Sequence, residues 1–188
     1  MRLLLVVVVA GALAGSALAE DITFQFGGVI ESVEPGIGGI WSDVVVGDEF
    51  AFTYVFDSET ADSEPDDPTS GLYEGILSYD LQVGEAHQAG VPLPIGFISV
   101  FPETERYAAL LTDVLTDLVV INIVDFEEGT LETDELPLTL DFDKKISTDF
   151  EFGTSTGLAT GEIQWFVPEP AVLSLMALAL PAVLRRRR

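Results

Sequence analysis

The stretch EFAFTYVFD, residues 49–57, places four aromatic side chains at every second position, with acidic, small or β-branched residues between them. A period of two is the pattern of a β-strand that buries one face and exposes the other. Further strand candidates, separated by turns rich in glycine, proline and acidic residues, are residues 22–26, 73–83, 95–101, 118–124, 136–142, 150–152 and 163–165. The sequence therefore predicts an all-β fold, an antiparallel β-sandwich of about eight strands, with a jelly roll as one option.

Three details refine this prediction. Gly27-Gly28, which follows the first strand candidate, indicates a β-bulge. Residues 118–124 are nearly all β-branched, which suits a strand that is buried on both faces. Pro137 places the strand predicted over residues 136–142 near an edge of the sheet, because proline has no amide hydrogen to donate.

Residues 104–117 allow two interpretations. Apolar side chains recur there at helical spacing, and Pro102-Glu103 before them is typical of a helix start. The alternative is one more strand that leads into residues 118–124. The periodicity favours the helix, so we expect at most one short helix in the domain.

Each end of the chain has the features of a targeting segment. Arg2 precedes an apolar run, and the small residues Ala17 and Ala19 predict signal-peptidase cleavage before Glu20, although a buried N-terminal helix is the alternative. Near the other end, the prolines of Val167-Pro168-Glu169-Pro170 restrict the backbone. The 14 uncharged residues 171–184 come next and span about 21 Å as a helix, so they predict a short transmembrane helix.

The chain ends in a cluster of arginines that would stay on the cytoplasmic side of a membrane. A nucleic-acid-binding tail is the rival interpretation, but the signal peptide would send the chain away from nucleic acid. The cluster consists of Arg185, Arg186, Arg187 and Arg188.

The combination of Pro168-Glu169-Pro170, a short apolar helix and terminal arginines resembles the PEP-CTERM sorting signal of Gram-negative bacteria. The resemblance implies processing by an exosortase, a membrane cysteine protease, and an association with exopolysaccharide and biofilm matrix; the same tail occurs on some ice-binding proteins. It further implies an inner-membrane intermediate, followed by release to the cell surface or extracellular matrix. The expected organisation is a signal peptide (1–19), a secreted acidic domain (20–166) and a sorting signal (167–188). No catalytic residue follows from the resemblance.

Composition limits what the exported domain does. All 32 acidic residues lie within residues 20–170, the part expected to be exported, where Arg106, Lys144 and Lys145 are the basic residues. Such a charge excludes nucleic acid and anionic lipid as direct partners. The sequence has no cysteine and one histidine, His87, which we expect in an exposed loop. These features argue against thiol, haem and zinc chemistry, so we expect no enzyme. A polysaccharide hydrolase is an alternative, although no carboxylate pair stands out.

Two binding functions stay open. Residues 57–70 form an acidic, proline-broken loop in which Asp57, Glu59 and Asp62 could bind calcium, while a simply solvated loop is the plainer interpretation. No other cofactor is expected. Trp41 and Trp165 could stack on sugar rings, as in a lectin-like module of the matrix, but tryptophans of this kind more often belong to the core.

Overall fold

The structure, a computed structural model, describes residues 21–93 and 95–169 and folds them into one antiparallel β-sheet of ten strands. The predicted signal peptide, Pro170, the predicted transmembrane helix 171–184 and the terminal arginines lie outside the described residues. The elements are β1 (Asp21–Val33), η1 (Gly39–Trp41), β2 (Glu49–Asp57), β3 (Gly71–Tyr73), β4 (Ile76–Val83), β5 (Ala86–Gly90), β6 (Gly96–Phe101), η2 (Pro102–Thr104), β7 (Arg106–Asp113), β8 (Leu118–Phe126), η3 (Phe142–Lys144), β9 (Lys145–Thr154) and β10 (Gly157–Glu169).

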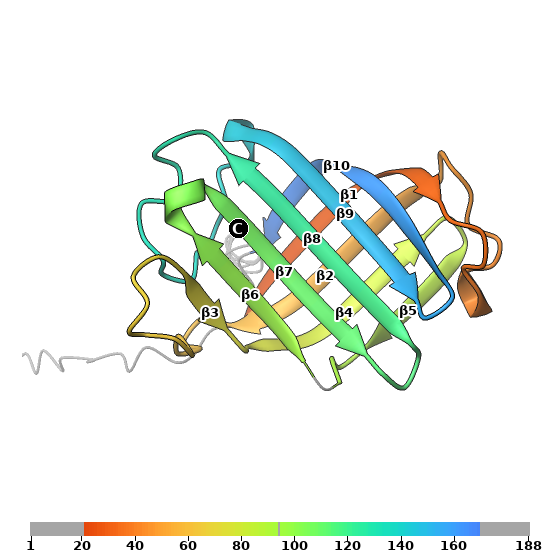
Figure 1. Cartoon of the computed structure of the whole chain (residues 1–188), viewed down its shortest axis with the longest axis horizontal. Coiled ribbons are helices and arrows are strands. Elements are labelled where there is room, and N and C mark those ends of the chain that lie inside the picture. The colour runs from red at the N-terminus through yellow and green to blue at the C-terminus, as the bar shows by residue number, and fades with distance from the viewer. Residues whose placement is uncertain (1–20, 94, 170–188) are drawn as a thin grey trace, which may run out of the picture.

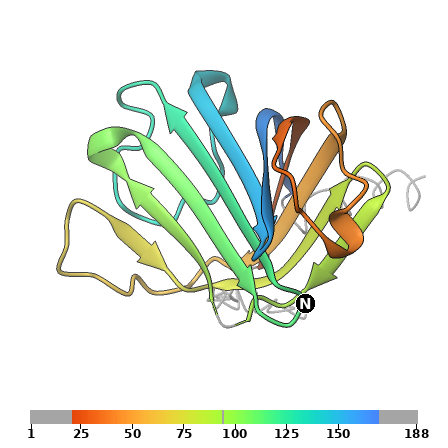
Figure 2. The same ribbon diagram turned by 45° about the vertical axis from the view of Figure 1, so that its right-hand side comes forward.

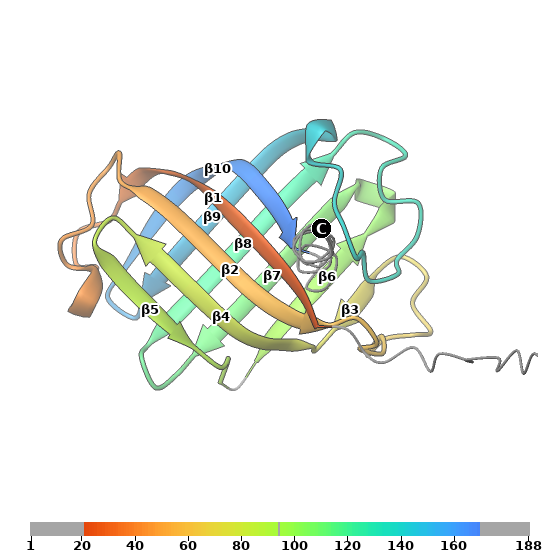
Figure 3. The ribbon, with the colours of Figure 1, turned by 180° about the vertical axis from the view of Figure 1, so that it is seen from behind.

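The strand order is β3-β6-β7-β8-β9-β10-β1-β2-β4-β5, so the last strand pairs with the first in the middle of the sheet. The sheet curls until its two halves face each other. Strands β6 to β9 form the near layer in Figure 1 and cross the strands of the far layer, which Figure 3 shows from behind. Figure 2 shows the sheet turning back on itself. The curl gives the molecule an inner face and an outer face.

Aromatic side chains fill the space between the two layers. Phe50 of β2 and Phe150 of β9 stack with ring centroids 3.9 Å apart, which joins the far layer to the near layer. The hydroxyls of Tyr54 and Tyr107 are hydrogen-bonded to each other inside the same core. Burial raises the pKa of both tyrosines, so both hydroxyls stay protonated. The alternation of residues 49–57 therefore produces the core as expected, since Phe50, Phe52, Tyr54 and Phe56 are all buried.

The prediction of an all-β antiparallel fold is confirmed, and its details need correction. There are ten strands instead of about eight, and they form a single curled sheet instead of the two separate sheets of a sandwich. No α-helix occurs in the described ranges 21–93 and 95–169. The preference for a helix within residues 104–117 was wrong, because Arg106–Asp113 is strand β7 and a tight turn follows it.

Two further strand predictions also change. Residues 136–142 lie in the connection between β8 and β9 and not in a strand. That connection is held by Glu105, whose carboxylate accepts hydrogen bonds from the amides of Gly129, Thr130 and Leu131. Strand β8 is buried on one face only: Val119 is 40% exposed, whereas Val120 is buried.

Candidate functional site

Strand β10 carries the features that sequence analysis assigned to sorting, and its second half forms one side of a groove. Residues Val167 to Glu169 continue the strand, and their backbone pairs with Gln25, Phe24 and Thr23 of β1. Val167 is 42% exposed on the outer face. The sheet thus extends through the described part of the motif, so the motif residues are extended and are also paired with a neighbouring strand.

A β-bulge divides β10 just before the motif. The register with β1 passes from Gly28–Ile163 to Gly27–Trp165, so Gln164 has no counterpart on β1. The bulge predicted at Gly27-Gly28 is therefore confirmed, with the extra residue on the opposing strand. An extra residue reverses the alternation of the following side chains. Ile163 faces the core, as does Phe166, whose ring lies 4.8 Å from that of Phe26, while Trp165 between them lies on the outer face.

Polar side chains of β9 hold the backbone at the start of this bulge. The Thr148 hydroxyl accepts a hydrogen bond from the Ile163 amide at 2.9 Å. The Ile163 carbonyl in turn accepts a hydrogen bond from the Lys145 ammonium at 2.8 Å. These contacts replace strand pairing, because the register of β9 with β10 ends at Gly161. The bulge is thus a fixed feature of the sheet.

Trp165 lies across Gly27 on the neighbouring strand. A β-carbon on Gly27 would lie 2.0 Å from Cζ2 of the indole and 2.3 Å from Cε2, so a side chain at this position would displace the ring. Gly28 is also required, because a β-carbon there would lie 1.8 Å from the carbonyl oxygen of Glu162. One side of the indole is therefore packed on the sheet, while the residue remains 40% exposed.

A groove of about 490 Å³ extends from Trp165 across the outer face. Its floor contains Gly28 and Ala51, and the strand register places Trp165, Gly27, Ala51 and Gln82 in one row across β10, β1, β2 and β4. Three strand spacings make that row about 14 Å long. The full lining consists of Gly28, Val29, Gly47, Asp48, Glu49, Phe50, Ala51, Gln82, Gly84, Gln164 and Trp165.

The polar groups of the groove come from both of its sides. The Gln82 amide donates a long hydrogen bond of 3.3 Å to the Gly84 carbonyl, and Asp48 accepts one from the Val45 amide. The side-chain amide of Gln164 is exposed and makes no hydrogen bond to the other residues that the structure describes. The groove therefore offers amide donors, amide acceptors and carboxylate acceptors around one indole face.

Trp41 occupies a different environment. It is 1% exposed and its ring packs against Phe152 with centroids 5.0 Å apart, so the expectation that tryptophans belong to the core is confirmed for Trp41 and wrong for Trp165. A second cavity of about 430 Å³ lies beside Trp41, between η1 and the residues Gln88 and Thr116. Trp41 lines it but presents almost no surface for stacking.

A buried polar network lies beside this second cavity. The Tyr79 hydroxyl donates to Asp113 at 2.6 Å, and the Gln88 amide donates to the Tyr79 hydroxyl at 2.8 Å and also to Thr116. Burial alone would raise the pKa of Asp113, but the hydrogen bonds from Tyr79, Leu115 and Thr116 outweigh burial and lower it. The polar groups of this network bind one another, which indicates a structural role.

The acidic loop after β2 uses its carboxylates to form turns. Asp57 accepts a hydrogen bond from the Glu59 amide, and Asp62 accepts from the amides of Glu64 and Leu72. Across residues 21–93 and 95–169, no three Asp, Glu or His side chains are placed to hold a metal ion together. The structure thus does not bring Asp57, Glu59 and Asp62 into one ligand cluster, and calcium binding stays a prediction.

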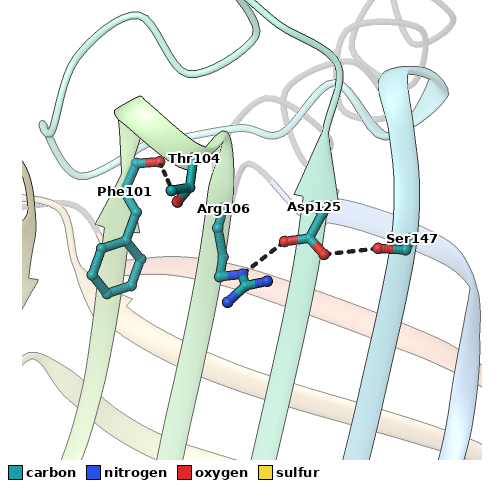
Figure 4. A network of polar contacts seen from close by, with 5 residues as sticks. All are labelled: Phe101, Thr104, Arg106, Asp125 and Ser147. Atoms are coloured by element: carbon teal, nitrogen blue, oxygen red, sulfur yellow. Dashed lines mark hydrogen bonds and ion pairs between the residues drawn. The ribbon is translucent and has the colours of Figure 1, made fainter.

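The basic residues of the described domain are engaged by acids or by the backbone. Arg106 on β7 donates to Asp125 on β8 at 2.7 Å, and Asp125 also accepts from Ser147 on β9, which Figure 4 shows on the outer face. Lys144 lies 3.7 Å from Asp141. His87 is exposed as expected, but it lies in strand β5 instead of a loop, and its Nε2 is 2.9 Å from Oδ2 of Asp80. These few basic residues leave most of the carboxylates without a cationic partner in the described domain, and its surface is strongly acidic.

Comparisons with protein families, with curated proteins and with solved structures found no match to this chain. The described residues contain no helix with the length and apolar character needed to cross a membrane. Sequence reasoning missed the pairing of Gly27 with Trp165 and the participation of Gln82. The Gly27-Gly28 pair was the signal that could have located them.

Proposed function

We propose that this chain is an exported, non-enzymatic protein of the cell surface or extracellular matrix, sorted and processed through its C-terminal segment by an exosortase-type membrane protease. The observation that best supports this is that the two ends of the described chain lie side by side in the middle of the sheet. Thr23 near the start of β1 pairs with Glu169 at the end of β10. The points at which the two predicted targeting segments join the domain therefore lie beside each other, which suits a domain held at a membrane.

In the proposed mechanism, residues 167–188 act as a sorting signal. Residues 171–184 cross the inner membrane as a short helix, and Arg185 to Arg188 resist being pulled through it. The folded domain then lies on the periplasmic side, with one residue, Pro170, between the paired strand and the helix. A protease needs an unpaired, extended backbone, so residues 167–169 have to separate from β1 before cleavage. Signal peptidase acts at Ala17 and Ala19, and the processed domain joins the exopolysaccharide matrix.

Five carboxyl groups of the described domain are poor candidates for the proton-donating acid of a glycosidase. A glycosidase needs one carboxylic acid whose pKa is raised, so that it can donate a proton. Within the described ranges, the carboxyl groups with a clear pKa shift are lowered, each through hydrogen bonds that favour the charged form. These groups are Asp67, Glu105, Asp113, Asp117 and Asp125.

Replacing Pro168, Glu169 and Pro170 together with alanine tests the sorting proposal. We expect the variant to accumulate as a membrane-retained precursor that still contains the C-terminal helix, because the protease no longer finds its motif. Intact-mass measurement on protein from membrane and medium fractions of the native cell identifies both trimmed ends. The unaltered chain should appear in the medium without residues 171–188.

The control is the triple variant Glu64→Ala, Pro65→Ala and Pro68→Ala. It removes the same residue types from the exposed acidic loop, and we expect normal trimming and release. If the motif variant is trimmed and released as the control is, the C-terminal motif is not recognised and the sorting proposal is wrong.

A further inference from the structure

Trp165 lines the groove on the outer face, and the fold does not require this side chain to be exposed. A strand without the bulge at Gln164 would continue its alternation and direct position 165 toward the core, as it directs Ile163. The bulge instead places both Gln164 and Trp165 on the outer face, where both line the groove. Bulges commonly re-aim side chains in this way next to functional sites.

The position of the indole favours a flat ligand. Gly27 provides a support without a side chain, on which the six-membered ring rests. The residue as a whole is 40% exposed and lines the groove. Packing on the sheet restricts the ring, so little conformational entropy is lost when a ligand stacks on it. This is the arrangement of a stacking platform.

The polar groups around the indole match a hydroxylated ligand. Gln82 and Gln164 provide amide groups that both donate and accept hydrogen bonds, and Asp48 and Glu49 provide carboxylate acceptors. A pyranose ring has an apolar C–H face and a rim of hydroxyls, so it can stack on an indole and bond to amides and carboxylates at once. The row from Trp165 to Gln82 is about 14 Å long, which suits a chain of such rings better than a single sugar.

Charge selects among polysaccharides. The two carboxylates in the groove and the acidic surface around it repel uronates and sulfated sugars. We propose that the groove binds a neutral polysaccharide, with one pyranose ring stacked on the outward side of Trp165 and its neighbours hydrogen-bonded to Gln82 and Gln164. This site goes beyond the sorting proposal and does not depend on it, because binding can be measured without any processing of the tail.

The test uses the full-length chain in a detergent without a sugar headgroup. The probes are cellohexaose, maltohexaose and N-acetylchitohexaose as neutral oligosaccharides, and hexaguluronate as the acidic comparison. We expect saturable calorimetric binding of at least one neutral probe and none of the acidic one. We expect Trp165→Ala to weaken that binding at least tenfold and Gln82→Ala to weaken it severalfold. Val167→Ala, which alters an exposed side chain on the same face of β10, should retain the affinity within a factor of about two.

Fluorescence gives a second readout. The chain has two tryptophans, so Trp41→Phe leaves Trp165 as the single tryptophan, and the bound neutral probe should shift its emission. Thermal unfolding of each variant, measured without probe, verifies that it is folded. Failure of all three neutral probes to bind at millimolar concentration overturns the proposal, as does binding that survives Trp165→Ala or equal binding of hexaguluronate.

Discussion

The two faces of strands β1 and β10 are built from similar residues for different purposes. On the inner face, Phe24 is fully buried and lies 5.0 Å from Phe56 and from Phe166 in edge-to-face contacts. On the outer face, Trp165, which directly precedes Phe166 in the sequence, rests on Gly27 and stays 40% exposed. The inner aromatics have many partners, and their burial stabilises the fold. The outer tryptophan has one glycine beneath it and a groove beside it.

This difference separates stability from recognition. Burial of a phenylalanine in a dense core contributes a few kcal/mol to the free energy of unfolding, and this stabilisation explains why the inner face is aromatic. An exposed indole contributes much less to the stability of the fold, so the presence of a tryptophan on the outer face needs another explanation. Substitutions on the inner face should therefore change the free energy of unfolding, and substitutions on the outer face should change it little.

The largest effect is expected for Phe150→Ala. The ring is fully buried and stacks on Phe50 across the interior, so its removal leaves a cavity between the two layers. We expect the free energy of unfolding to fall by about 3–5 kcal/mol, measured by urea denaturation. The control on the same strand is Ile146→Ala, since Ile146 is 68% exposed, and its expected effect is within about 0.5 kcal/mol. Equal losses for the two variants would contradict the division between the faces.

An intermediate effect is expected for Tyr107→Phe. Its hydroxyl and that of Tyr54 are buried and bonded to each other, so the single substitution leaves the Tyr54 hydroxyl without its partner. The expected cost is about 1–3 kcal/mol. The double variant Tyr54→Phe and Tyr107→Phe removes both hydroxyls and should be more stable than the single variant, as measured in the same urea experiments. A double variant that loses the sum of both single effects would show that the pair is not a unit.

The smallest effect is expected on the outer face for Asp125→Asn. The Arg106 guanidinium lowers the pKa of Asp125 through its hydrogen bond and charge, with a second hydrogen bond from Ser147. For this partly exposed pair we expect about 0.2–1 kcal/mol at pH 7. A lowered pKa stabilises the fold above the unfolded value of about 3.9, and this stability is lost as the pH falls through the lower folded value.

The matching measurement compares the unfolding free energies of the unaltered chain and Asp125→Asn from pH 7 downward. Because both proteins share all other titrating groups, their difference isolates Asp125. The difference should be constant above about pH 5 and should shrink at lower pH. A difference that does not change with pH would show that the carboxylate charge makes no contribution.

Periodicity predicted the strands whose inner residues are apolar. It failed where a strand and the turn after it together gave apolar residues at helical spacing. Tyr107 and Leu111 are inward positions of β7. Val114 and Leu115 lie in the turn that follows and are 67% and 79% exposed. Together these residues repeat at helical spacing, although they belong to a strand and a turn. The sequence could not show that the strand ends at Asp113, where backbone and side-chain hydrogen bonds form the turn.

The alternation of residues 136–142 misled for a different reason. Strands β8 and β9 pair directly with each other, so the connection between them has no strand on which to continue the sheet. Leu140 is buried beneath it while Leu138 is 55% exposed. The contact that fixes the connection is the Glu105 carboxylate, 24 to 26 residues earlier in the chain. Local sequence cannot reveal a partner at that separation.

The groove was predictable only in part. Gly27-Gly28 indicated a bulge, and the exposed use of a tryptophan was one of the alternatives for Trp165. Which strand carries the extra residue, and which side chains then share the outer face, depends on the pairing of β1 with β10. Those strands are separated by most of the domain in sequence, so the register is a property of the folded sheet.

The neighbouring positions of Thr23 and Glu169 make the strand circuit nearly cyclic. The first and last strands of the described domain already pair with each other, so a short peptide could join them without altering the strand order. Any exposed hairpin turn, such as that between β4 and β5, could then provide new ends. We therefore expect the same sheet to form wherever along this circuit the polypeptide is opened.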